Sequence, residues 1–164
     1  MLRGKALKFG DDISTDLIQP GRYNYHRSNL PELAKHVLED ADPTFASKVK
    51  KGDFIVAGKN FGLGSSREHA PAILKLAGVS AILAKSVARI FFRNAINVGL
   101  PVLICDTDKI NDGHELEIDL ASGTIVNLTN GAKLTSGAIP DVMLQILSEG
   151  GLVPYIKKHG DLKI

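Results

Sequence analysis

The stretch Gly58-Lys-Asn-Phe-Gly-Leu-Gly-Ser-Ser-Arg-Glu-His-Ala70 decides how the rest of the chain is interpreted. It follows an apolar run, Phe54–Ala57, that is typical of a buried strand. It precedes a second apolar run, Ile73–Ala77, that has helical spacing. The stretch is therefore a glycine-rich loop between a strand and a helix. In α/β folds such loops carry polar groups to a ligand.

The spacing within this loop does not fit the common phosphate-binding or nucleophile motifs. A Walker loop needs Lys followed by Ser or Thr after its last glycine, but Ser65-Ser66 follows Gly64. A dinucleotide fingerprint needs glycine where Arg67 stands, and a nucleophile elbow around Ser66 needs glycine where Glu68 stands. What remains is two hydroxyls beside an arginine. Because a guanidinium grips a carboxylate through two parallel hydrogen bonds, the loop indicates a small carboxylate ligand.

A purely structural interpretation of the same residues is also open. Ser65 and Glu68 have the spacing of a capping box, which would make Arg67 a surface residue of the first helical turn. Pro71 argues against a helix that runs through this point, because proline is accommodated in a first turn and not in a helix interior. We therefore expect the helix to begin near Pro71. Spacing alone does not decide between the functional and the structural interpretation.

Composition limits the classes of function. The 164 residues predict one domain, residues 1–164, with an ordinary globular composition of 44% hydrophobic and 23% charged residues. A net charge of +2 is too small to indicate nucleic acid or a membrane surface as partner. No apolar run approaches the ~20 residues that span a bilayer, and no signal peptide is recognisable, so we expect a cytoplasmic protein. A lone cysteine, Cys105, cannot form an internal disulfide or ligate an iron–sulfur cluster by itself.

The order of the remaining patterns predicts an α/β fold. Apolar runs at 3–9, 53–57, 79–85 and 102–105 are expected strands, and the last of them makes Cys105 an inert core residue. Helical spacing marks 30–39, 71–77, 87–98 and 140–149, with a further short helix in the tail after 152. Alternation at 116–120 and 125–128, then 133–135, predicts antiparallel strands. The expected architecture is a parallel α/β core joined to added antiparallel β strands.

Three further polar stretches have structural and functional interpretations. Residues 11–16 fit a network of Asx and Ser/Thr turns. Residues 23–28 form a polar, aromatic loop, in which Tyr23 and Tyr25 are expected to be partly buried with their hydroxyls in water. Arg89 and Arg93 lie four residues apart on one helix, where solvated or ion-paired side chains are the more common outcome.

Two of these segments carry a resemblance to a known family. Gly64–Ala70, Gly-Ser-Ser-Arg-Glu-His-Ala, resembles one signature of the swivelling domain of the aconitase superfamily, and Asp11–Tyr23 resembles the other. The length and order of the chain are similar to the free-standing small subunits of 3-isopropylmalate dehydratase and homoaconitase. The resemblance covers nearly the whole chain. It implies the swivelling β/β/α fold over residues 1–164.

The resemblance also implies a chemistry. Enzymes of this superfamily dehydrate and rehydrate hydroxy acids on a 4Fe-4S cluster, which in the two-chain forms is held by the large subunit and not by the small one. On matching positions, Ser65 resembles the serine that removes the carbon-bound proton, and Arg67 resembles the arginine that binds the substrate carboxylate. Ser66 resembles a neighbouring hydrogen-bond donor, and Asp16 an aspartate that supports the site. The implied partners are a cluster-bearing large subunit and a small carboxylic acid, with no nucleic acid and no membrane.

The substrate expectation depends on the loop after Gly21, where Tyr23, Tyr25 and Arg27 are candidate substrate-binding residues. Homoaconitase small subunits resemble this chain but hold an arginine in the place of Tyr25, which pairs with an extra carboxylate. A phenol has no charge to do so, and this favours isopropylmalate, an intermediate of leucine biosynthesis. Arg22 and Arg27 flank the loop, and their positive charges leave a tricarboxylate substrate as an alternative. The alternatives are a homoaconitase or other methyl-malate dehydratase subunit, a stand-alone domain that binds a small anion, and an RNA binder, which the low charge disfavours.

Overall fold

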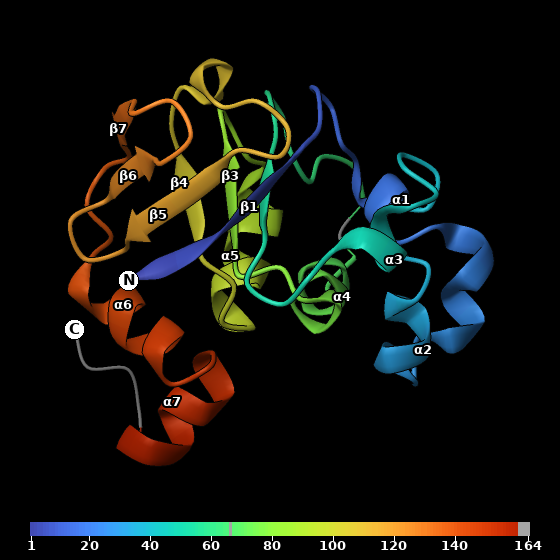
Figure 1. The fold of residues 1–164 in the computed structure, drawn as a ribbon. Helices are drawn as coiled ribbons and strands as arrows, with labels where there is room; N and C mark the ends of the chain where they lie inside the picture. The colour runs from blue at the N-terminus through green and yellow to red at the C-terminus, as the bar shows by residue number, and fades with distance from the viewer. Residues whose placement is uncertain (66, 161–164) are drawn as a thin grey trace.

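The computed structural model describes residues 1–65 and 67–160, and its centre is a seven-stranded sheet (Figure 1). The strand order is β4-β3-β2-β1-β5-β6-β7. The strands are β1 (Leu2–Lys8), β2 (Phe54–Val56), β3 (Ala81–Ala84), β4 (Val102–Ile104), β5 (Glu115–Asp119), β6 (Thr124–Asn127) and β7 (Lys133–Thr135). Strands β1 to β4 pair in parallel, whereas β5 to β7 add to β1 in antiparallel fashion. The predicted parallel core with added antiparallel strands is confirmed.

Short helices cover and extend this sheet. They are α1 (Thr15–Ile18), α2 (Leu30–Ala34), α3 (Phe45–Lys48), α4 (Ala70–Ala77), α5 (Arg89–Asn97), α6 (Asp141–Ser148) and α7 (Leu152–His159), with 3-10 turns η1 (Gly21–His26) and η2 (Thr107–Lys109). In Figure 1, α1, α2 and α3 gather on one side of the molecule, and α6 and α7 lie on the other side near the N-terminus. Within the described residues, no helix combines the length and the apolar character that crossing a membrane requires.

Each strand of the parallel core separates two apolar clusters because its side chains alternate between the two faces. In β2, Ile55 packs into the cluster that contains Leu33 and Leu74 of the helices. Its neighbours Phe54 and Val56 pack into the other cluster, which contains Leu116 of β5. All three residues of β2 are fully buried, which explains why this strand is a continuous apolar run in the sequence. Cys105 is buried in the second cluster, as predicted.

One predicted helix is shorter than its sequence pattern indicates. The apolar face over residues 30–39 predicts a helix of that length, but α2 ends at Ala34 and the chain continues in turns. Leu38 has a φ of 57°, and its backbone N–H donates to the carbonyl of Ile18 at 3.0 Å instead of closing a helical turn. The tertiary contact with α1 therefore ends the helix earlier than the helical spacing of its apolar residues predicts.

The parallel strands bring three loops to one edge of the sheet. The loop after β1 (residues 9–14), the loop after β2 (57–69) and the loop after β3 (85–88) all leave the carboxyl ends of neighbouring parallel strands. In open α/β sheets this edge is where ligands bind. The glycine-rich loop is the middle one of the three.

Candidate functional site

Backbone hydrogen bonds fix the glycine-rich loop to both of its neighbours. Gly62 N–H donates to the carbonyl of Ile13 at 2.7 Å, and the N–H of Thr15 donates to the carbonyl of Leu63 at 2.9 Å. On the other side, Phe61 N–H donates to the carbonyl of Ser86 at 3.1 Å. Because the loop is held at several points, the groups that follow Gly64 are presented from a rigid base.

Gly62 is required for the loop to reach this position. Its φ is +79°, a conformation that residues with a Cβ rarely adopt. A Cβ built on Gly62 would lie 2.3 Å from Cγ of Phe91. Phe91 is a buried residue near the start of α5. Glycine here lets the loop lie directly on α5, so the loop and α5 form the two sides of one site.

Ser65 lies in the loop and not at the start of a helix. Helix α4 begins at Ala70, its N-cap residue is His69 without a side-chain cap, and Pro71 lies in its first turn. The capping-box interpretation of Ser65 is therefore wrong, and the predicted start of the helix near Pro71 is confirmed. Ser65 is exposed, and its carbonyl accepts a hydrogen bond of 2.7 Å from the hydroxyl of Thr15. Thr15 is 3% exposed, so this bond ties Ser65 to the buried start of α1.

Arg67 joins the loop to α1 and η1 through its guanidinium. Nε donates to Oδ1 of Asp16 at 2.8 Å, and Nη2 donates to the same oxygen. Nη1 donates to Oδ1 of Asn24 at 3.3 Å. A guanidinium has five N–H groups. Contacts with described residues use one on each nitrogen. Among the described residues, one N–H on Nη1 and one on Nη2 have no acceptor, and a carboxylate can accept hydrogen bonds from N–H groups on both terminal nitrogens.

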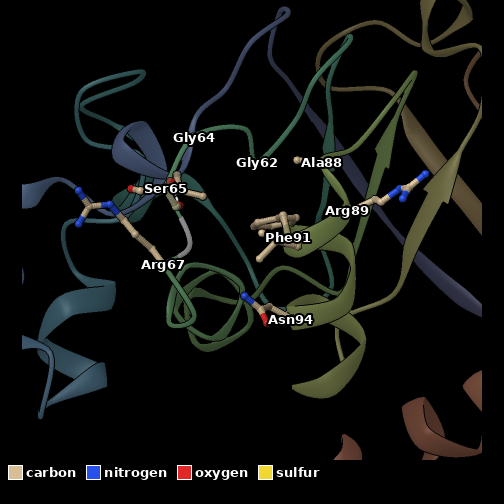
Figure 2. Close-up of a pocket in the computed structure, with 10 residues that line it drawn as sticks. Gly62, Gly64, Ser65, Arg67, Ala88, Arg89, Phe91 and Asn94 are labelled. Atoms are coloured by element: carbon tan, nitrogen blue, oxygen red, sulfur yellow. Dashed lines mark hydrogen bonds between the residues drawn. The ribbon is translucent and has the colours of Figure 1, made fainter.

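A cavity of ≈ 210 Å³ lies between the loop and α5. Its lining includes Gly64, Ser65 and Arg67 from the loop and Phe91 and Asn94 from α5. Figure 2 shows Phe91 and Asn94 on the α5 side of Ser65, with the Arg67 guanidinium extending from the loop in the opposite direction, toward α1 and η1. Ser65 therefore stands between the guanidinium and the wall of the cavity that α5 provides.

Among the described residues, Tyr23, Tyr25 and Arg27 form no hydrogen bond with Ser65 or Arg67, although Asn24 of the same turn contacts Arg67. Tyr23 stacks on His36 with ring centroids 3.7 Å apart, and Tyr25 is 72% exposed with its ring against His26. Partial burial was therefore correct for Tyr23 and wrong for Tyr25. Arg27 is exposed and forms no ion pair with the residues that the structure describes. Ser66 lies outside the described residues.

Arg22 is engaged by acidic residues near η1. It donates to Glu39 at 2.8 Å and to Asp40 at 2.7 Å. A hydrogen bond with Tyr23 is the largest cause that lowers the pKa of Glu39, and the hydrogen bond from Arg22 lowers the pKa of Asp40. Because its guanidinium serves these carboxylates, Arg22 is not the free cation that a tricarboxylate ligand would need.

Sequence patterns missed four residues that shape the site: Thr15, Gln19, Asn24 and Asn94. Thr15 stood in the polar stretch that was interpreted as a turn network, and the start of α1 at Thr15, with Ser14 as its N-cap, corrects that interpretation. Asn94 follows Arg93 within the amphipathic pattern of α5, where a single amide gives no separate signal. Arg89 lines the cavity, although Figure 2 shows its guanidinium directed away from Ser65.

The described part of the chain does not fit an iron–sulfur cluster or a metal ion. It contains no group of three His, Cys, Asp or Glu side chains in a metal-binding arrangement. The one thiol is buried, and this burial raises the pKa of Cys105 to about 11, which keeps the sulfur protonated and unsuited to ligation. The described part of the site presents a hydroxyl and a guanidinium.

Comparisons with known proteins identify the family of the chain. The family model of the aconitase C-terminal domain matches residues 11–106, which contain the loop and α1. A 3-isopropylmalate dehydratase small subunit of Archaeoglobus fulgidus is 70% identical over 98% of both chains, and one of Thermotoga maritima is 65% identical over 98% of this chain and 97% of its own. A Methanocaldococcus jannaschii protein named as an isopropylmalate/citramalate isomerase small subunit is 52% identical over 96% of this chain and 95% of its own.

A solved structure confirms the fold. The crystal structure of a 3-isopropylmalate dehydratase from Methanocaldococcus jannaschii superposes with a TM-score of 0.92 at 48% identity, over 97% of this chain and 95% of that one. The swivelling β/β/α fold is thereby confirmed. The chain belongs to the aconitase C-terminal domain family and, within it, to the small subunits of the hydro-lyase 3-isopropylmalate dehydratase.

Proposed function

We propose that this chain supplies half of the active site that interconverts 2-isopropylmalate and 3-isopropylmalate, by dehydration and rehydration, for leucine biosynthesis. The observation that carries the proposal is the pair formed by Ser65 and Arg67. The guanidinium keeps two donors for a carboxylate, and the serine two residues earlier is exposed and held through its own carbonyl. The names of the relatives give the substrate class.

Arg67 binds a carboxylate of the substrate. One N–H on each terminal nitrogen accommodates the two oxygens of a carboxylate in the bidentate arrangement that arginine favours. Asp16 holds the opposite edge of the guanidinium, formed by Nε and Nη2. Asp16 thus acts on the substrate through the orientation of Arg67. The neighbouring Ser66 is a candidate hydrogen-bond donor to the same ligand.

Ser65 is the base. Dehydration breaks a C–H bond and a C–O bond, and in this account the Ser65 alkoxide takes the carbon-bound proton, while rehydration returns it from the Ser65 hydroxyl. A serine hydroxyl is a poor base at its ordinary acidity, so its ionised form needs positive surroundings. Arg67 supplies one such charge. We infer that the large subunit supplies the other positive charge that the ionised form of Ser65 needs.

The proposal needs a large subunit as partner, because a chain with one cysteine does not supply the several thiolates that an iron–sulfur cluster ordinarily takes. We infer that a 4Fe-4S cluster on that subunit supplies Lewis-acid chemistry toward the hydroxyl that leaves. The name "small subunit" in the relatives supports a two-chain enzyme. Residues 1–164 would act as one swivelling domain that closes on this partner, in the cytoplasm, without nucleic acid or membrane as ligand.

Tyr23, Tyr25 and Arg27 remain candidate substrate-binding residues of η1 and the turn after it. Tyr23 and Tyr25 flank Asn24, which contacts Arg67, and the backbone N–H of Arg27 donates to the carbonyl of Asn24 at 3.0 Å. Tyr25 is exposed enough to meet a substrate or the partner chain, whereas Tyr23 is stacked on His36 and has less freedom. An uncharged residue at position 25 favours a substrate with an alkyl substituent over one with a third carboxylate.

A second candidate substrate is citramalate, a malate with a methyl substituent. It is favoured by the relative named as an isopropylmalate/citramalate isomerase small subunit, which is 52% identical over 96% of this chain. A homoaconitase subunit has less support because Arg22 is already ion-paired with Glu39 and Asp40. A stand-alone anion-binding domain would bind carboxylates without a partner.

Reconstitution tests the proposal. The chain is co-purified anaerobically with a cluster-bearing large subunit, and turnover of 2-isopropylmalate, citramalate and homocitrate is measured. We expect turnover of 2-isopropylmalate by the pair and none by either chain alone. Turnover of homocitrate without isopropylmalate would contradict the substrate assignment. Tight binding of isopropylmalate by the isolated chain, with no activity in any pair, would favour the anion-binding domain.

A further inference from the structure

We propose that Asn24 is a positioning residue for Arg67, and that it fixes the plane in which the guanidinium meets the substrate carboxylate. This inference rests on the proposed function for its kinetic consequence. Its structural basis is a pair of hydrogen bonds that converge on one atom. Oδ1 of Asn24 accepts from Nη1 of Arg67 at 3.3 Å and from Nε2 of Gln19 at 3.2 Å.

The contact with Asp16 does not hold the guanidinium by itself. Nε and Nη2 of Arg67 both donate to the same oxygen, Oδ1, so the two bonds converge on one point about which the guanidinium can tilt. The Asp16 side chain is also 67% exposed, and water competes for an exposed ion pair. The bond from Nη1 to Asn24 adds a separate point of attachment. With this second acceptor in place, the guanidinium cannot tilt about the Asp16 oxygen without lengthening the bond to Asn24.

Gln19 gives Asn24 a firm anchor. Gln19 is 4% exposed, and its backbone N–H donates to the carbonyl of Thr15 at 2.8 Å at the end of α1. Its Oε1 has no hydrogen-bond partner among the described residues, so the bond to Asn24 is the one that orients its amide. Asp16 lies in α1, and Gln19, three residues later, is the C-cap residue of that helix. They hold Arg67 from two sides, Asp16 directly and Gln19 through Asn24.

The consequence is a link between η1 and the carboxylate-binding group. Asn24 lies between the candidate substrate residues Tyr23 and Tyr25, so the position of this turn and the orientation of Arg67 depend on each other. Arg67 binds the carboxylate in both the ground state and the transition state. A loosened guanidinium should therefore weaken binding more than it slows the chemical step.

The experiment compares the assembled two-chain enzyme containing Asn24→Leu, which has similar volume and no acceptor, with the wild type. We expect KM for 2-isopropylmalate to rise about fivefold, the loss of one modest hydrogen bond, with kcat within about twofold. Gln19→Met should give a smaller rise, and the double variant should equal Asn24→Leu because both act through one link. Ser28→Ala, an exposed residue of the same segment, is the matched control and should leave both constants unchanged.

A second measurement does not depend on turnover. In the isolated chain, the 15N signals of the Arg67 guanidinium are assigned by their loss in Arg67→Lys, and rotation about the Cζ–Nη1 bond is followed by NMR. We expect restricted rotation in the wild type and faster rotation in Asn24→Leu or, if that variant does not fold, in Asn24→Ala. Unchanged rotation, or a fall in kcat with constant KM, would overturn the role of Asn24. An inactive wild-type pair with the predicted change in rotation would instead place the failure in the proposed function.

Discussion

Arg67 meets Asp16 through a single carboxylate oxygen, which accepts from both Nε and Nη2 of the guanidinium. The two residues are far apart in sequence and belong to the two signatures that flank β2. Their pairing occupies the edge of the guanidinium formed by Nε and Nη2. With the further bond from Nη1 to Asn24, contacts with described residues leave one N–H on each terminal nitrogen without an acceptor. Under the proposed function, the motif that contains Arg67 would bind the carboxylate, and the motif that contains Asp16 would orient the guanidinium.

Asp16→Asn tests this pairing. The amide keeps an acceptor but loses the charge, so Arg67 should lose its fixed orientation, and kcat/KM of the assembled enzyme for 2-isopropylmalate should fall about tenfold or more. The free energy of unfolding should change by less than about 0.5 kcal/mol, because the side chain is exposed and exposed ion pairs contribute little.

A matched control is Asp108→Asn. Asp108 is 71% exposed and pairs with Lys85 at 2.6 Å, so it has the same chemistry and exposure without contact to Arg67. Its loss should leave kcat/KM unchanged. Equal effects of the two substitutions would show that Asp16 is an ordinary surface charge.

Thr15→Val tests how the position of Ser65 is set. Valine has nearly the shape of threonine but cannot donate to the Ser65 carbonyl, which leaves that carbonyl without the 2.7 Å bond. We expect a loss of about 1 kcal/mol in unfolding free energy and a fall in kcat of about tenfold, because a displaced base reacts poorly. Thr15→Ser keeps the hydroxyl and should restore most of the rate. Equal rates for the valine and serine variants would contradict the positioning role.

Gly62→Ala and Gly113→Ala form a matched pair that isolates a steric clash. Both glycines have nearly the same φ, +79° and +81°. The strain of a left-handed backbone therefore lowers the unfolding free energy of both alanine variants. A Cβ on Gly113 meets nothing within 4 Å, whereas one on Gly62 lies 2.3 Å from Phe91 Cγ. Denaturant unfolding should show Gly62→Ala to be about 1–3 kcal/mol less stable than Gly113→Ala. Equal stabilities would mean that α5 moves away easily and that the cavity wall is not fixed.

Tyr25→Arg tests the basis of the substrate assignment. A guanidinium at this exposed position can pair with a third carboxylate, so the ratio of kcat/KM for a tricarboxylate over that for 2-isopropylmalate should rise about tenfold. Tyr25→Leu removes the phenol without adding charge, and it separates the two effects. If the ratio is the same for the arginine variant, the wild type and the leucine variant, position 25 does not select the substrate.

Much of the fold follows from local patterns. β2 and β3 are short and fully buried, so their apolar runs are unambiguous, and Pro71 marks the start of α4. Helix α2 was overestimated because the turn at Leu38 depends on a bond to Ile18 from a distant segment. Such tertiary contacts leave no periodic signal in sequence.

The candidate site was predictable in part. The chemistry of the loop residues made them candidates, but spacing alone did not decide between a functional and a structural role. The motif resemblance was needed to associate Asp16 with the site, because Asp16 and Arg67 lie on separate elements. Asn24 and Gln19 were not predictable at all. Their roles depend on the way η1 packs between α1 and the loop, and amide side chains in turns are common everywhere in proteins.

The central claim is that this chain contributes the base, and Ser65→Ala tests it most directly. The variant is assembled with the large subunit, and kcat for 2-isopropylmalate is measured beside the thermal unfolding of the small chain. The account predicts a fall in kcat of about a thousandfold, within the range for loss of a general base. It also predicts an unfolding free energy within about 0.5 kcal/mol of the wild type, since Ser65 is exposed and caps no helix. A correctly assembled, stable Ser65→Ala enzyme that keeps the wild-type rate would contradict it.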